Sequence, residues 1–204
     1  MPERTRITVL KLGGAQARSG HLHDWLQAID RNVGRIVVVA GGGPFADVVR
    51  STQPEIGFDD AAAHEMALNA MGQFARAITG VMPRFRLADS MHEMHDLLAR
   101  ELTPVWSPAP MVLEAGLPAT WSITSDSLSA WLAGRLHAER LILVKYGGRG
   151  VSADNLSNLG IVDPAFPDFF RGASTPTFLA SPDESELLAL GLDGKAFAEI
   201  PIHS

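Results

Sequence analysis

Three short apolar segments, each followed at once by glycine, most constrain what this chain can fold into. Residues 7–10 lead into Lys11-Leu-Gly-Gly14, residues 36–39 into Ala40-Gly-Gly-Gly43, and residues 141–144 into Lys145-Tyr-Gly-Gly148. Unbroken apolar runs of this length are typical of strands that are covered on both faces, as in parallel sheets. Glycine then allows a tight turn at the end of each strand. The pattern predicts buried parallel strands whose carboxyl ends carry glycine loops.

Helical spacing separates these strands. Leu22, Trp25, Leu26 and Ile29 fall at positions i, i+3, i+4 and i+7, which is one face of a helix. Pro44 is well placed in the first turn of a second helix. The order strand, loop, helix, strand, loop, helix predicts a right-handed parallel βαβ arrangement and an α/β fold.

Further elements follow with less regular signals. Asp59 and Asp60 can cap a long helix that Gly80 would stop. We also predict strands at 85–88 and 103–106, the second weakened by Pro104. Capping-box patterns predict helices from Ser90 and Ser181, the latter with Pro182 at its first position and an end near Gly191. Leu128, Trp131, Leu132 and Leu136 have helical spacing, residues 198–202 suit an edge strand, and residues 108–122 and 148–167 give no clear prediction.

Composition excludes several classes of protein. With 204 residues, 46% apolar and 20% charged, the chain suits one globular domain covering residues 1–204. It contains no cysteine, which removes disulfides, thiolate metal sites and cysteine nucleophiles. A net charge of −6 gives no basic field for nucleic acid. We see no signal-peptide or membrane-span character, so we expect a cytoplasmic protein with no membrane or nucleic-acid partner. His92 and His95 lie three residues apart without a third ligand, and we predict no metal site there.

The glycine loops predict an anion site. Ligands of parallel α/β sheets bind outside the carboxyl ends of the strands, where glycine lets backbone N–H groups approach a phosphate closely. Lys11 and Lys145 add point charges suited to phosphate. The alternative is that each glycine pair only makes a tight turn. Neither a P-loop nor a dinucleotide-binding fingerprint is present.

Four motifs resemble the amino acid kinase superfamily, in order along nearly the whole chain. They are Val9-Leu-Lys-Leu-Gly-Gly14, Val38-Val-Ala-Gly-Gly-Gly-Pro-Phe-Ala46, Thr124-Ser-Asp-Ser-Leu-Ser-Ala130 and Leu141-Ile-Leu-Val-Lys145. The resemblance implies a three-layer αβα sandwich with a mainly parallel central sheet. It also implies an ATP- and Mg²⁺-dependent kinase, expected to be a homo-oligomer, with acceptor-binding and nucleotide-binding halves at about 1–122 and 123–204.

The resemblance also implies roles for matching residues. Lys11 would contact the transferred phosphoryl group, Asp126 would orient the lysines, and Lys145 would approach the ATP phosphates. The amides of Gly13, Gly14, Gly42 and Gly43 would hold phosphate oxygens. From the residues alone, Asp126 could instead cap a helix and Lys145 could be solvated. Phosphoryl transfer requires alignment and charge neutralisation more than a protein base.

The nucleotide-side loop departs from the family pattern. The family often has a carboxylate-containing segment after this strand, whereas this chain has Tyr146-Gly-Gly-Arg-Gly150. Tyr146, Gly148, Arg149 and Gly150 remain candidates for binding nucleotide, with Arg149 reaching a phosphate. The segment Ala198-Glu-Ile also departs from the Gly-Thr-Ile often seen in the family. These departures support an alternative hypothesis, a nucleotide- or oxyanion-binding protein on the same fold.

Within the superfamily, the chain is similar to the kinases of methanofuran biosynthesis, which phosphorylate an aminomethylfuran-methyl phosphate. Residues 45–50, 63–71, 124–126 and 161–164 carry this likeness. The expected acceptor is a small-molecule phosphate or carboxylate. Arg50, His64, Thr124 and Ser125 are the candidate acceptor-binding residues, although His64 could equally be a surface or satisfied histidine.

Overall fold

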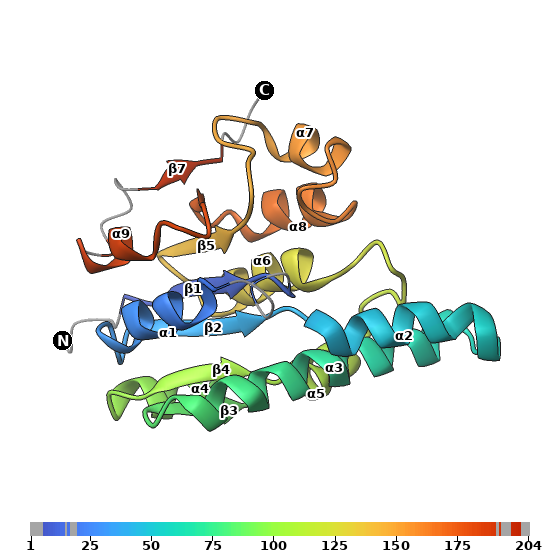
Figure 1. Ribbon diagram of the computed structural model, residues 1–204, viewed down its shortest axis with the longest axis horizontal. Helices are drawn as coiled ribbons and strands as arrows, with labels where there is room; N and C mark the ends of the chain where they lie inside the picture. Colours follow the sequence, from blue (N-terminus) through green and yellow to red (C-terminus); the bar gives the residue numbers. More distant parts are fainter. Residues whose placement is uncertain (1–5, 15, 17–19, 191, 193–196, 201–204) are drawn as a thin grey trace.

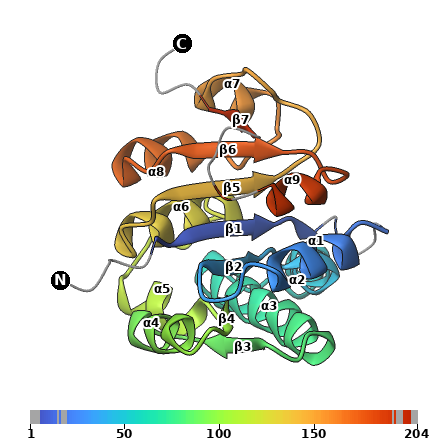
Figure 2. The same cartoon turned by 90° about the vertical axis from the view of Figure 1, so that its left-hand side faces the viewer.

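A computed structural model describes residues 6–14, 16, 20–190, 192 and 197–200 of the chain. Its centre is a seven-stranded sheet in the order β3-β4-β2-β1-β5-β6-β7, seen stacked from bottom to top in Figure 2. Neighbouring strands are parallel except for β7, which runs antiparallel to β6 at one edge. The strands are β1 (Thr8–Leu12), β2 (Ile36–Ala40), β3 (Phe85–Ala88), β4 (Thr103–Trp106), β5 (Arg140–Val144), β6 (Thr177–Ala180) and β7 (Ala198–Glu199).

Helices cover both faces of the sheet and give it two apolar cores. Side chains alternate across each strand, so Val9 of β1 packs into one core while Leu10 and Leu12 pack into the other. The described helices are α1 (Leu22–Asp30), α2 (Gly43–Ile56), α3 (Asp60–Val81), α4 (Met91–Ala99), α5 (Ala109–Glu114), α6 (Ser125–Arg135), α7 (Ala153–Asn158), α8 (Phe166–Ala173) and α9 (Ser185–Ala189). Buried residues of α4 to α8 join the core of Val9, and those of α1 and α9 join the other. The predicted three-layer α/β sandwich is confirmed.

Strand β1 lies between β2 and β5, in a register that aligns Leu12 with Ala40 and with Val144. The three predicted glycine loops therefore leave the same edge of the sheet side by side. From this edge α2 and α3 run outward as a pair of long helices that extends past the sheet (Figure 1). The fold thus places the loops, and the helix that begins with Gly43, around one region.

The strand predicted at 103–106 forms inside the sheet, although proline usually confines a strand to a sheet edge. Strand β4 lies between β3 and β2, and all four of its residues are buried. The amides of Thr103 and Ser107 donate to β3, at Arg84 and Ala88. Because donors alternate along a strand, the missing N–H of Pro104 faces β2. Strands β2 and β4 pair at Val38 and Val105 alone. The sheet accommodates the proline because few hydrogen bonds join these two strands.

Other boundaries differ from the prediction for local reasons. Helix α3 continues one residue past Gly80, to Val81. The final capping box forms in part: the Glu184 carboxylate accepts from the Ser181 amide at 2.8 Å, but the helix begins only at Ser185. Helices α5, α7 and α8 and strand β6 were not predicted. The predicted end at Gly191 and the last two residues of the predicted 198–202 strand lie outside the described residues. In the part of the chain that the structure describes, no helix is long and apolar enough to cross a bilayer.

Candidate active site

The first two glycine loops are in direct backbone contact. A Cβ atom added at Gly14 would lie 2.7 Å from Gly43 Cα, and one added at Gly41 would lie 2.8 Å from the Gly14 nitrogen. Gly43 has a φ of +55°, a left-handed conformation that favours glycine. No other residue type could keep these loops so close. Two separate predicted loops therefore form one surface of backbone N–H groups at the start of α2.

Behind this surface lies a buried cluster of three charged side chains. Lys11 Nζ is 2.6 Å from Asp126 Oδ1, and Lys145 Nζ is 2.6 Å from Asp126 Oδ2. Lys11 comes from the centre of the sheet, Asp126 from the first turn of α6, and Lys145 from the end of β5. The two ammonium groups and one carboxylate leave one net positive charge. A Cβ at Gly13 would lie 3.6 Å from Lys11 Nζ, so the cluster directly adjoins the glycine loops.

Burial and mutual attraction oppose each other in this cluster. Burial lowers the pKa of Lys11 to about 8, with Lys145 acting in the same direction and Asp126 against it. Burial would raise the pKa of Asp126, but Lys11 and Lys145 outweigh that effect and hold it below its ordinary value. Asp126 is therefore a permanent anion at neutral pH that retains two cations in one place.

Asp163 fixes the start of α6. Its carboxylate accepts hydrogen bonds from the amide and hydroxyl of Thr124, at 3.0 and 2.8 Å, and from the amide and hydroxyl of Ser127. The helix-capping role that the sequence left open for Asp126 thus belongs to Asp163. Two residues earlier, the Ile161 carbonyl accepts from Lys145 Nζ at 2.6 Å. One loop therefore positions both Asp126 and Lys145, and Lys145 is not a freely solvated lysine.

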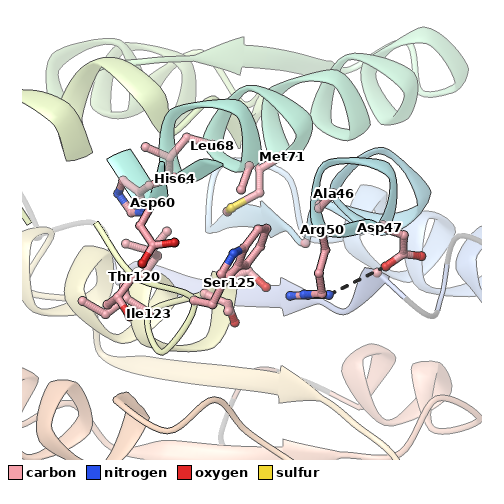
Figure 3. Close-up of a pocket in the computed structure, with 18 residues that line it drawn as sticks. Ala46, Asp47, Arg50, Asp60, His64, Leu68, Met71, Thr120, Ile123 and Ser125 are labelled. Carbon is pink, nitrogen blue, oxygen red and sulfur yellow. Dashed lines mark ion pairs between the residues drawn. The ribbon is translucent and has the colours of Figure 1, made fainter. Parts of the chain in front are cut away.

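A pocket of about 520 Å³ opens in front of the glycine loops (Figure 3). Helices α2 and α3, the glycines and the segment that leads into α6 form its walls. Its lining includes all four predicted acceptor-binding residues, Arg50, His64, Thr124 and Ser125. Apolar side chains of α3, Leu68 and Met71, line the part towards the sheet. The structure thus brings the predicted acceptor residues together next to the predicted phosphate loops.

Polar residues surround the outer part of the pocket. Arg50 lies over the Trp121 ring, with its guanidinium carbon 4.5 Å from the ring centroid, and 4.0 Å from Asp47. Gln53 accepts from the Trp121 indole at 2.7 Å and donates to Asp60 at 2.9 Å. These contacts tie the segment before α6 to the α2–α3 pair.

His64 is neither exposed nor satisfied. It is 8% exposed, and its Nε2 has no hydrogen-bond partner among the described residues. Burial lowers the pKa of His64, so the ring is neutral at physiological pH. A neutral imidazole in a pocket wall can donate or accept one hydrogen bond from a ligand.

The nucleotide-side loop lies apart from this pocket. Tyr146 is exposed, and Arg149 forms an ion pair with Glu184. Gly148 and Gly150 both have left-handed φ values, of +85° and +70°. A Cβ at Gly148 would meet the Leu156 side chain at 2.5 Å, which packs this loop onto the core. Nucleotide binding by these residues stays a prediction.

A group of three or more His, Asp or Glu side chains that could hold a metal ion is not found in the described ranges. Both oxygens of Asp126 already face lysines. Mg²⁺ commonly binds through substrate phosphates with one or two carboxylates. Asp126 therefore offers no free carboxylate oxygen to a metal ion.

Asp60 and Asp163 were not assigned to the site from the sequence. The sequence indicated that the pair Asp59 and Asp60 could cap α3; Asp59 does so, accepting from the Ala62 amide at 2.8 Å, and Asp60 lines the pocket. Asp163 was noted only within the family-like residues 161–164. The sequence signal that could have identified Asp163 is its place before Pro164, in the segment that follows Lys145.

We predict that Gly14→Ala strongly weakens ATP binding, because the added methyl group would meet the Gly43 backbone at 2.7 Å and separate the two loops. Gly20→Ala is the matched control, since no atom lies within 4 Å of its added Cβ. ATP binding by calorimetry measures the effect. Equal affinity in the two variants would contradict the role of the paired loops.

The lowered pKa of Lys11 predicts a pH limit. Its ammonium loses its proton as pH rises through about 8, and a neutral amine cannot offset phosphate charge. We expect kcat/KM to fall above pH 8 and approach a tenfold loss per pH unit. In Lys11→Arg the guanidinium stays charged, so the kcat/KM of any residual activity should not fall above pH 8. A profile from pH 6.5 to 10 compares the two.

Asp163→Ala should lower the free energy of unfolding by about 2 to 4 kcal/mol, since it removes a helix cap and leaves buried donors unpaired. It should also lower kcat, since Asp126 would no longer be held. Asp154→Ala, on the neighbouring α7, removes only an exposed ion pair with Arg171 and should change stability by less than about 1 kcal/mol. Urea unfolding of both variants tests this, and equal costs would exclude the capping role.

Known proteins are similar to this chain in sequence and in fold. The family model described as "Amino acid kinase family" matches residues 6–154. The [5-(aminomethyl)furan-3-yl]methyl phosphate kinase of Methanocaldococcus jannaschii is 23% identical over 174 residues, covering 79% of this chain and 80% of that protein.

Solved structures of kinases have the same fold. A UMP kinase from Bacillus anthracis superposes with a TM-score of 0.70 at 15% identity, over 98% of this chain and 97% of its own. A uridylate kinase from Archaeoglobus fulgidus gives a TM-score of 0.64 at 15% identity, over 90% of this chain and 95% of its own.

The family match covers well over half of the chain, and it spans Lys11, both glycine loops, Asp126 and Lys145. On this evidence the chain belongs to the amino acid kinase family and is a phosphotransferase.

Proposed function

We propose that this kinase transfers the γ-phosphoryl group of ATP to a small-molecule phosphate bound in the pocket between α2, α3 and α6. The observation that carries the proposal is the buried cluster in which one carboxylate, Asp126, holds Lys11 and Lys145 at 2.6 Å each. Two cations fixed beside a surface of glycine amides suit a reaction in which charge spreads over phosphoryl oxygens.

The reaction needs little else from the protein. An oxygen of the acceptor phosphate, already anionic at neutral pH, forms the new bond to the γ-phosphorus. The bond from that phosphorus to the bridging oxygen breaks, and ADP leaves with the electron pair. Lys11 offsets charge on the transferred group, and Lys145 offsets charge on the nucleotide side. Gly13, Gly14, Gly42 and Gly43 hold phosphate oxygens through their amides, and Asp126 keeps both ammonium groups in line.

The nucleotide side would be completed by residues 146–150. Tyr146, Gly148, Arg149 and Gly150 follow directly on Lys145, at the carboxyl end of β5, where ligands of parallel sheets bind. Mg²⁺ would accompany the ATP phosphates. Arg149 would have to leave Glu184 in order to contact a phosphate.

For the acceptor we propose [5-(aminomethyl)furan-3-yl]methyl phosphate, the compound in the name of the Methanocaldococcus jannaschii relative. The pocket supports an acceptor of this size and type, with a volume of about 520 Å³ and both apolar and charged lining residues. A carboxylate acceptor receives no comparable support. A binding protein without catalysis is also disfavoured, because the relatives are kinases and the charged cluster is complete.

The proposal includes assembly into a homo-oligomer in the cytoplasm, where ATP and Mg²⁺ are abundant. Helix α2 buries only Val49 among its 14 residues and exposes Val48 and Ile56. A second copy could cover such apolar side chains, which light scattering of the purified chain would detect.

Lys11→Ala should lower kcat at least about 100-fold, since it removes a fixed charge at the transferred group. ADP release with ATP and the proposed acceptor measures the loss. Circular dichroism must show an intact fold, because removing Lys11 also takes one of two cationic partners from the buried Asp126 carboxylate. Arg100→Ala removes an exposed cation just after α4 that is paired with Asp96; this variant is the control and should retain full activity. Unchanged turnover in Lys11→Ala would refute the proposed mechanism.

A further inference from the structure

The acceptor pocket is electrically divided along its length. Its inner part is lined by Gly14 and by Gly41 to Gly43, and these glycine loops adjoin the positively charged cluster of Lys11, Asp126 and Lys145. Among the ionised side chains that line the pocket, Arg50 lies near Asp47. Asp60 forms no ion pair with any described residue, so the lining itself retains one net negative charge.

Helix α3 places that charge away from the phosphate loops. Asp60 is the first residue of α3 and is hydrogen-bonded to Gln53 of α2. Helix α2 begins at Gly43, so at 1.5 Å per residue Gln53 lies roughly 15 Å along the helix axis from that glycine loop. Figure 3 shows Asp60 and His64 together on one side of the pocket and Arg50 and Asp47 on the other. Asp60 and His64 are four residues apart, on the same helix face.

Both side chains retain unused hydrogen-bonding capacity. Gln53 donates to Asp60 Oδ1 at 2.9 Å, and no described residue donates to Oδ2. His64 is more than nine-tenths buried, lines the pocket, and has an unpartnered Nε2. Buried polar groups are seldom left without a partner unless a ligand supplies one. A carboxylate oxygen and a neutral ring nitrogen together offer two acceptors to a donor that carries positive charge.

We infer that Asp60 and His64 form an ammonium-binding subsite, so that the acceptor of this kinase is a zwitterion with its phosphate at the glycine loops and a primary ammonium at Asp60. The inference rests on the proposed function and assigns the residues that select the amine. Leu68 and Met71, between the two ends, pack against the uncharged body of the acceptor. A neutral His64 does not repel the ammonium, whereas a protonated one would.

Two acceptors that differ only at the amine test the inference. The probes are [5-(aminomethyl)furan-3-yl]methyl phosphate and its 5-ethyl analogue, in which a methyl group replaces the ammonium at the same length. The unaltered enzyme should prefer the amine about 10- to 150-fold in kcat/KM, the range for a hydrogen bond to a charged group. In Asp60→Asn the preference should fall to about 2-fold, through a higher KM for the amine, with the ethyl analogue unaffected.

Matched variants separate recognition from folding. Glu65→Gln removes the same charge from the adjacent turn of α3, where Glu65 is exposed and does not line the pocket, and it should keep the full preference. His64→Leu should weaken the preference and His64→Gln should restore part of it, because Gln again supplies an acceptor. An undiminished preference in Asp60→Asn, or an equal loss in Glu65→Gln, overturns the inference.

Equilibrium binding distinguishes a failure of the proposed function from a failure of the ammonium-binding subsite. If neither probe is phosphorylated, the proposed function fails for this acceptor, and calorimetric affinities of the two probes then decide the subsite. Tighter binding of the amine that is lost in Asp60→Asn supports it. Equal affinity of the two probes for the unaltered protein overturns it.

Discussion

The ion cluster of Lys11, Asp126 and Lys145 is the interaction on which the site depends. Lys11 and Asp126 are each 3% exposed. An unpaired lysine at the centre of a sheet would strongly destabilise the folded protein. Asp126 offsets that cost, but only if α6 begins close to the carboxyl ends of β1 and β5. Asp163 fixes that helix start with four hydrogen bonds. The charge that suits phosphoryl transfer is therefore also a requirement of the fold.

The cluster explains why glycine is needed on two successive strands. Positive charge behind the loops attracts phosphate, but the anion must approach the backbone closely to use it. Side chains at Gly14 or Gly41 would push the β1 and β2 loops apart, as the 2.7 and 2.8 Å contacts show. Parallel pairing of the two strands then brings the loops together without any further contact. Charge and backbone access thus come from the same three neighbouring strands.

Sequence patterns predicted well those strands, helices and caps that depend on neighbouring residues in the chain. The β-branched run at 36–39, the helical spacing of Leu22 to Ile29 and the cap before α4 all recur in the structure. Prediction failed where the cause was tertiary. Strand β4 accommodates Pro104 because its neighbour β2 pairs with it at one residue. The short helices α7 and α8 are stabilised by packing against the core, which the spacing of their apolar residues does not predict. Asp163 acts across 36 to 39 residues, so no spacing rule could assign it to the start of α6.

The pair Asp59 and Asp60 shows how finely a functional role depends on local geometry. Either residue could cap a helix, and the sequence offered no reason to separate them. Asp59 adopts an extended conformation and bonds to the Ala62 amide, which places Asp60 inside the first helical turn. From there its side chain shares a face with His64 and lines the pocket. Had the helix begun one residue later, Asp60 would cap it and the pocket would lose its unpaired carboxylate. A one-residue choice of helix start therefore determines the charge that the outer pocket presents to an acceptor.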